Sequence, residues 1–136
     1  MAEKKYSIWP AIVVLVVAFG VPTAIGTIEV RIARNAHAES AAIQQMEAIV
    51  KAENAYHAEH QSYSATLDAI RDLPKPENYY AYHYMFLSPD KYAATAQPNY
   101  PGKYGRRYFY TDQTGEVRYE VMKEAGAGSE AVPEKK

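Results

Sequence analysis

The chain has 136 residues, a formal net charge of −1, 13 tyrosines and no cysteine. The absence of cysteine excludes disulfides and thiolate metal sites, and the near-zero net charge argues against general nucleic-acid binding. The length leaves room for one small domain beside an N-terminal segment.

The first predicted element is an uncharged run over residues 8–28, which reads IWPAIVVLVVAFGVPTAIGTI. About 20 apolar residues at about 1.5 Å per residue match the roughly 30 Å hydrocarbon core of a bilayer. The run therefore predicts a transmembrane helix. Pro22 removes a backbone donor within this helix and is expected to kink it.

Two other interpretations compete with the membrane anchor. A cleaved secretory signal is suggested by the basic residues before the run and by Ala36-His37-Ala38, which resembles a cleavage site. The charges at Glu29, Arg31 and Arg34 lie before that site and favour an anchor that is kept. A buried core helix would need a larger domain around it than the rest of the chain provides. We expect a cytoplasmic N-terminus and an exported C-terminal domain.

The segment from Glu29 to His60 contains no proline or glycine and is rich in helix-favouring residues. It predicts that the helix continues into water as a stem. Apolar residues recur along it as one stripe, which could pack on a sheet or on a partner helix. The stripe comprises Ile32, Ala36, Ile43, Met46, Val50 and Tyr56. The candidate residues for stem and subunit packing are Pro22, Ile43, Met46, Val50 and Tyr56.

The rest of the chain changes from helical to strand-like patterns. Ser64 is placed to cap a short helix that ends near Asp72, before a pair of prolines. After it the period becomes two, and the alternation predicts a four-stranded antiparallel meander. Its strands are expected at 79–87, 92–96, 107–111 and 116–121. Residues from Lys123 onward are predicted to form a disordered tail. The predicted organisation is a flank at 1–7, a transmembrane helix at 8–28, a stem at 29–62, a sheet domain at 63–122 and a tail at 123–136.

This order of elements resembles the type IV pilin and type II secretion pseudopilin family. The resemblance is carried by the segments 39–43, 49–56, 63–67 with Leu73, 92–98, 105–112 and 115–119. It implies an α+β fold in which a long N-terminal membrane-spanning helix continues into a stem that packs on a small four-stranded antiparallel sheet. It also implies an oligomeric assembly with other pilin-like subunits at the bacterial inner (cytoplasmic) membrane. The expected function is a structural subunit of a pilus or secretion apparatus.

The N-terminus departs from the family pattern. Family members carry a basic leader ending in glycine, then an apolar run with a glutamate inside it. Residues 5–9, Lys-Tyr-Ser-Ile-Trp, contain neither residue, and Glu29 follows the run. The alternative function is therefore a single-pass accessory subunit of another membrane complex, with an extracytoplasmic pilin-like interaction domain.

An enzyme is the least favoured class, and no catalytic, cofactor or metal residue is assigned. His57 and His60 share one helix face, with Glu53 four residues before His57, but this spacing is not the HExxH arrangement. Asp112 and Glu116 flank a turn, although calcium needs more oxygen ligands than these two acids supply. We expect structural roles for these residues and no cofactor.

Overall fold

The computed structural model describes the backbone of residues 9–133 and the side chains of residues 26–133. The chain divides into two units, residues 1–33 and 34–136. Helix α1 (Trp9–His60) is followed by a short 3₁₀ turn, η1 (Leu67–Ala69), and then by the strands. The strands are β1 (Tyr80–Ser88), β2 (Lys91–Pro98), β3 (Arg107–Asp112), β4 (Arg118–Val121) and β5 (Glu130–Ala131).

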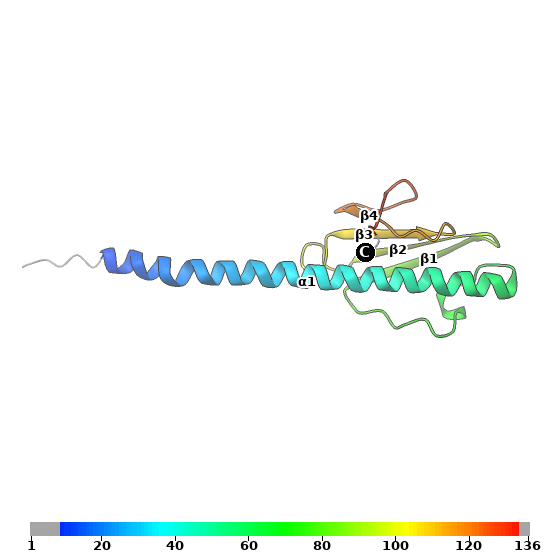
Figure 1. The fold of residues 1–136 in the computed structure, drawn as a ribbon, viewed down its shortest axis with the longest axis horizontal. Helices are drawn as coiled ribbons and strands as arrows, with labels where there is room; N and C mark the ends of the chain where they lie inside the picture. Colours follow the sequence, from blue (N-terminus) through cyan, green and yellow to red (C-terminus); the bar gives the residue numbers. More distant parts are fainter. Residues whose placement is uncertain (1–8, 134–136) are drawn as a thin grey trace, which may run out of the picture. The chain divides into compact units, whose positions relative to one another are not determined.

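The strands form one antiparallel sheet in the order β1-β2-β3-β4-β5 (Figure 1). Each strand pairs with the next one in the chain, as in Tyr84 opposite Ala94 and Phe109 opposite Tyr119. Antiparallel neighbours need only short connections. The β3–β4 turn contains Gly115 at a φ of 79°, a backbone conformation that glycine adopts readily.

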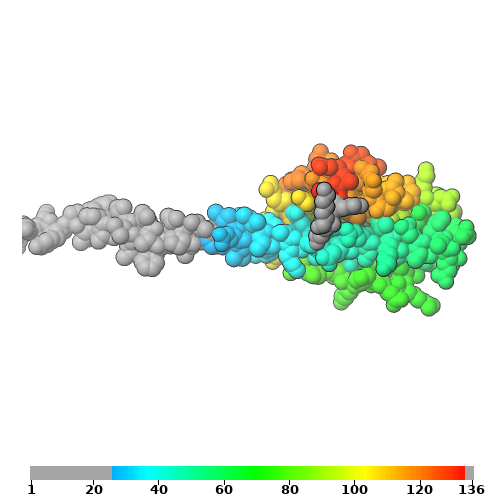
Figure 2. Space-filling view, in the orientation of Figure 1, coloured from blue at the N-terminus to red at the C-terminus, as the bar shows by residue number. Residues whose placement is uncertain are grey.

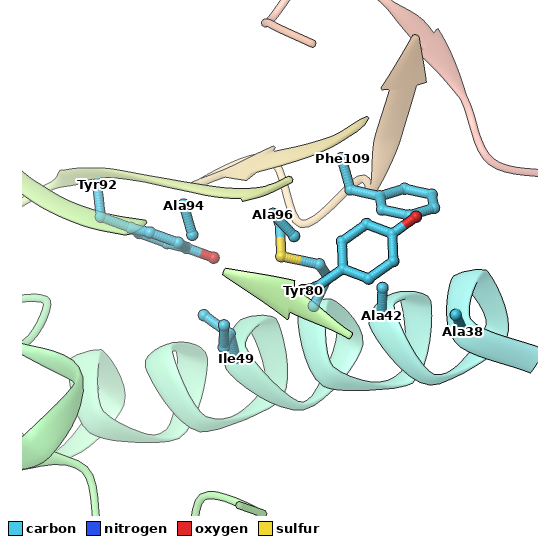
Figure 3. Packing of buried hydrophobic residues seen from close by; sticks show 9 residues of the cluster. Ala38, Ala42, Ile49, Tyr80, Tyr92, Ala94, Ala96 and Phe109 are labelled. Carbon is cyan, nitrogen blue, oxygen red and sulfur yellow. The ribbon is translucent and has the colours of Figure 1, made fainter. Parts of the chain in front are cut away.

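The core of the second unit lies between α1 and one face of the sheet. Figure 3 shows the rings of Tyr80, Tyr92 and Phe109 between the strands and the helix, and all three are buried. On the helix side the buried apolar residues are Ala38, Ala42, Met46 and Ile49. Their spacing of three or four residues places them on one face of the helix. The two alanines let the sheet aromatics lie close to the helix backbone.

The predicted fold class is wrong in two respects. The sheet has five strands, not four, because β5 pairs with β4 inside the segment from Lys123 for which disorder was predicted. In addition, no helix within the described residues has a stretch long and apolar enough to cross a membrane. Where the side chains of α1 are described, charges at Glu29, Arg31 and Arg34 interrupt its apolar residues. The side chains of residues 8–25, which form most of the predicted transmembrane run and include Pro22, are outside the described part of the chain.

The short helix predicted after Ser64 is reduced to the turn η1. Thr66 precedes this turn and its side chain makes no capping hydrogen bond, while no residue of η1 is buried. Ser64 is instead fully buried and bonded to Glu53. The proposed cap is thus used in a tertiary contact, and a helix without a buried face gains little from packing.

Candidate interaction site

The exposed side of α1 in the second unit forms a continuous surface, which we name the outer face. Figure 2 shows α1, coloured cyan to green, along this side of the unit, apart from the part behind the grey atoms. Its exposed residues are Ala36, His37, Gln44, Glu47, Lys51, Asn54, Ala55, Ala58 and Glu59. These positions lie opposite the buried face on a helix of 3.6 residues per turn. The side chains of the outer face are polar or small, and none of them is large and apolar.

The first unit contributes a different surface. Every described side chain of this unit, residues 26–33, is exposed. Three of them are large and apolar: Ile28 is 58% exposed, Val30 63% and Ile32 63%. We name this segment the apolar segment. Large apolar side chains that are exposed close to one another are typical of interaction sites.

The residues predicted for stem packing differ in burial and in the parts of the structure that they contact. Met46 is completely buried against the sheet, and Ile43 is half-buried beside the same core. Val50 is half-buried and lies near the Gly115 turn. Tyr56 is half-buried with its ring 4.2 Å from that of His60. Their proposed contact with other subunits stays a prediction.

A buried polar cluster fastens the end of α1 to the sheet. Glu53 is 0% exposed and accepts hydrogen bonds from the backbone N–H of Ser64, at 3.0 Å, and from the Ser64 hydroxyl. The Tyr84 hydroxyl donates to the Ser64 carbonyl at 2.8 Å. A buried carboxylate is tolerated when such donors replace its water. The cluster therefore fixes the chain where α1 ends and joins it to β1.

Tyrosine hydroxyls surround this cluster and are hard to ionise. Burial raises the pKa of Tyr84 and of Tyr92 well above the ordinary value, and the nearby charge of Glu53 adds to both shifts. Burial also raises the pKa of Tyr82 to about 12, with Glu77 as a second cause. The Tyr92 hydroxyl is buried without a hydrogen-bond partner among the described residues. We therefore interpret these tyrosines as parts of the core.

The basic and aromatic residues near the β2–β3 loop form a stacked group. The Lys103 ammonium lies 5.1 Å from the Tyr104 ring centre, and the Arg34 guanidinium lies 5.3 Å from the same ring. Arg107 pairs with Glu39 at 3.5 Å and lies over the Tyr119 ring at 4.6 Å. The cations are thus held by local partners, which accounts for them without a ligand.

The residues weighed for metal binding do not converge. No group of three His, Cys, Asp or Glu residues placed to hold a metal exists within the described part of the chain. The Nε2 atom of His57 lies 3.4 Å from Oδ1 of Asp90, whereas the carboxyl group of Glu53 accepts hydrogen bonds from Ser64. In the β3–β4 turn, one oxygen of Asp112 accepts from the backbone and hydroxyl of Thr114.

Sequence reasoning missed the roles of Glu53 and of Asn35. The side-chain oxygen of Asn35 accepts from the Gly105 N–H at 3.1 Å, and Gly105 has a φ of +118°. A side chain at Gly105 would collide with the Tyr80 ring. The only signal for Glu53 was its spacing from Met46 and Ile49, which places an acid on the buried face.

Comparison of the sequence with protein-family models and with characterised proteins found no match.

Proposed function

We propose that this protein is a structural subunit of a pilin-like or pseudopilin-like assembly, acting through protein–protein contacts of α1. The observation that carries the proposal is the apolar segment of α1. Ile28, Val30 and Ile32 are all more than half exposed. Ile28 and Ile32 are four residues apart and share one face of the helix, so a second helix that covers both gains free energy.

The second unit supports the same function. One face of α1 is used to hold the sheet, and the outer face is free of it, so the domain stays folded while the helix is available to neighbours. On the outer face Glu47 precedes Lys51 by four residues, an arrangement that stabilises an exposed helix. Small residues at Ala55 and Ala58 allow close approach of a second helix.

The partners are other pilin-like subunits in an oligomeric assembly. The predicted location, at the bacterial inner membrane with the C-terminal domain outside the cytoplasm, is part of this proposal. The alternative, an accessory subunit of another membrane complex, predicts the same contact with a protein of different sequence.

Cross-linking tests the contact directly, because the native chain has no cysteine. The full-length Ile32→Cys variant is expressed in cells and oxidised with diamide. We expect disulfide-linked dimers of the chain. Ala42→Cys is the matched control, because Ala42 is 0% exposed and should form none. An adduct with a different protein, identified by its mass, would support the accessory subunit instead.

A second variant separates the contact from the fold. Ile28→Asp with Ile32→Asp places two charges in the apolar segment and should remove the species assembled through α1 in sedimentation velocity. Val121→Asp, at an exposed β4 residue, should leave the assembly intact. An unchanged assembly in the double variant would overturn the proposal.

A further inference from the structure

Strand β1 forms one edge of the sheet and is open to pairing. It is the first strand in the order, so only β2 pairs with it. Among the described residues, no hydrogen bond from outside the sheet reaches a backbone group of residues 81–87. Alternate residues of an edge strand direct their N–H and C=O groups away from the sheet.

The sequence of β1 lacks the features that protect an edge. It reads YAYHYMFLS, with no lysine, arginine, acid or proline over nine residues. Natural edges are usually short or carry charges, prolines or bulges. The register irregularity of β1 falls between Phe86 and Ser88, so residues 80–86 pair regularly. The opposite edge, β5, is only two residues long.

Large apolar side chains gather at the same edge. Met85 is 53% exposed, Phe86 42% and Leu87 58%. Because successive side chains of a strand alternate, Met85 and Phe86 project from opposite faces of the sheet. A partner resting on one face would cover only one of them. A strand added at the edge brings side chains to both faces and covers both.

We propose that β1 pairs antiparallel with β1 of a second copy of this chain, joining two sheets across a twofold axis. The strand fits itself because its only titratable side chains are one histidine and its tyrosines, so no like charges are opposed. With the axis at Tyr84, Phe86 lies opposite Tyr82 and Met85 lies opposite His83. These are aromatic and apolar cross-strand pairs, which stabilise antiparallel sheets.

This contact uses a surface separate from the outer face and from the apolar segment. A twofold contact closes on itself, whereas contacts along α1 can repeat from subunit to subunit. The inference therefore stands without the proposed function. The two contacts can be tested independently.

Single cysteines test the edge in the full-length chain. His83→Cys and Met85→Cys are oxidised with diamide separately and as a mixture. Residues directly opposite each other in an antiparallel pair lie within reach of a disulfide. We expect a disulfide dimer from at least one of the three samples, with the position identifying the axis. Gln97→Cys, exposed on the interior strand β2, is the control and should give none.

Lysine substitution provides a second measurement. Met85→Lys with Leu87→Lys should remove the β1 dimer in sedimentation velocity, while the thermal unfolding midpoint stays close to that of the native chain, since both residues are exposed. Val121→Lys, at a residue of β4 that is 48% exposed, should keep the dimer. Absence of cross-links in all three cysteine samples would overturn the β1 contact. If Ile32→Cys still cross-links, the contact through α1 stands alone.

Discussion

At the scale of single residues, the most consequential side chain is the buried carboxylate of Glu53. It accepts two hydrogen bonds from Ser64. Replacing Glu53 with alanine leaves the buried Ser64 N–H without its acceptor, which costs about 1–3 kcal/mol. We expect the free energy of unfolding in urea to fall by that amount in Glu53→Ala.

The control for this variant is Glu59→Ala. Glu59 lies on the same helix, but its side chain is 80% exposed. Its replacement should change the free energy of unfolding by no more than about 0.5 kcal/mol. Equal losses in the two variants would contradict the assignment of the effect to the buried cluster.

Residue roles were predicted from the sequence only in part. Met46 was placed on the packing stripe and is fully buried, but Ile32 and Ala36 of that stripe are exposed. The prediction favoured the larger apolar residues, whereas the buried face uses Ala38 and Ala42. Small residues carry a weak apolar signal in sequence, yet they are required where a helix lies against aromatic rings.

At the scale of elements, the helix–sheet contact depends on those small residues. Ala42 is 0% exposed and belongs to the core cluster with Tyr80 and Phe109. A leucine there must displace packed atoms, which typically costs about 1–3 kcal/mol. We expect Ala42→Leu to lower the unfolding midpoint in denaturant. Ala55→Leu, on the outer face, should leave the midpoint nearly unchanged, and a similar loss in both would contradict the packing argument.

The strands show why element prediction succeeded for β1 to β4 and missed β5. Alternating aromatic residues gave a clear period of two from Tyr80 onward. The segment before β5 is rich in glycine and polar residues and has no such period. Its position depends on partners elsewhere, including the Ser129 carbonyl that accepts from Arg118 at 2.8 Å and the Val132 N–H that donates to Val117. Contacts of this kind are invisible to local patterns.

At the scale of the whole molecule, the described chain offers two kinds of surface for assembly. The apolar residues of α1 are exposed with the charged residues Glu29 and Arg31 between them, whereas the open edge of β1 carries no lysine, arginine or acid. The core of the second unit contains tyrosines whose pKa values are raised by burial. The stability of the fold therefore depends on keeping the hydroxyls of these tyrosines neutral. Both proposed contacts need the folded chain.

This dependence predicts unfolding at alkaline pH. In the folded chain burial raises the pKa of Tyr82 from 10.0 to about 12, and it raises the pKa values of Tyr80, Tyr84 and Tyr92 as well. The unfolded chain therefore loses protons first, and the stability present below pH 10 falls as the pH rises toward 12. Tyrosinate absorbance should rise in two phases, with the second coinciding with loss of the circular dichroism signal.

A phenylalanine in place of the half-buried Tyr82 removes one of the ionising groups. Tyr82→Phe should move the alkaline unfolding midpoint to higher pH, because the unfolded state no longer gains from ionising that residue. Tyr100→Phe, at a tyrosine that is 60% exposed, is the matched control and should leave the midpoint in place. If the second absorbance phase came before the loss of circular dichroism, the tyrosines would be ionising within the folded chain, and burial would not be the source of the alkaline limit.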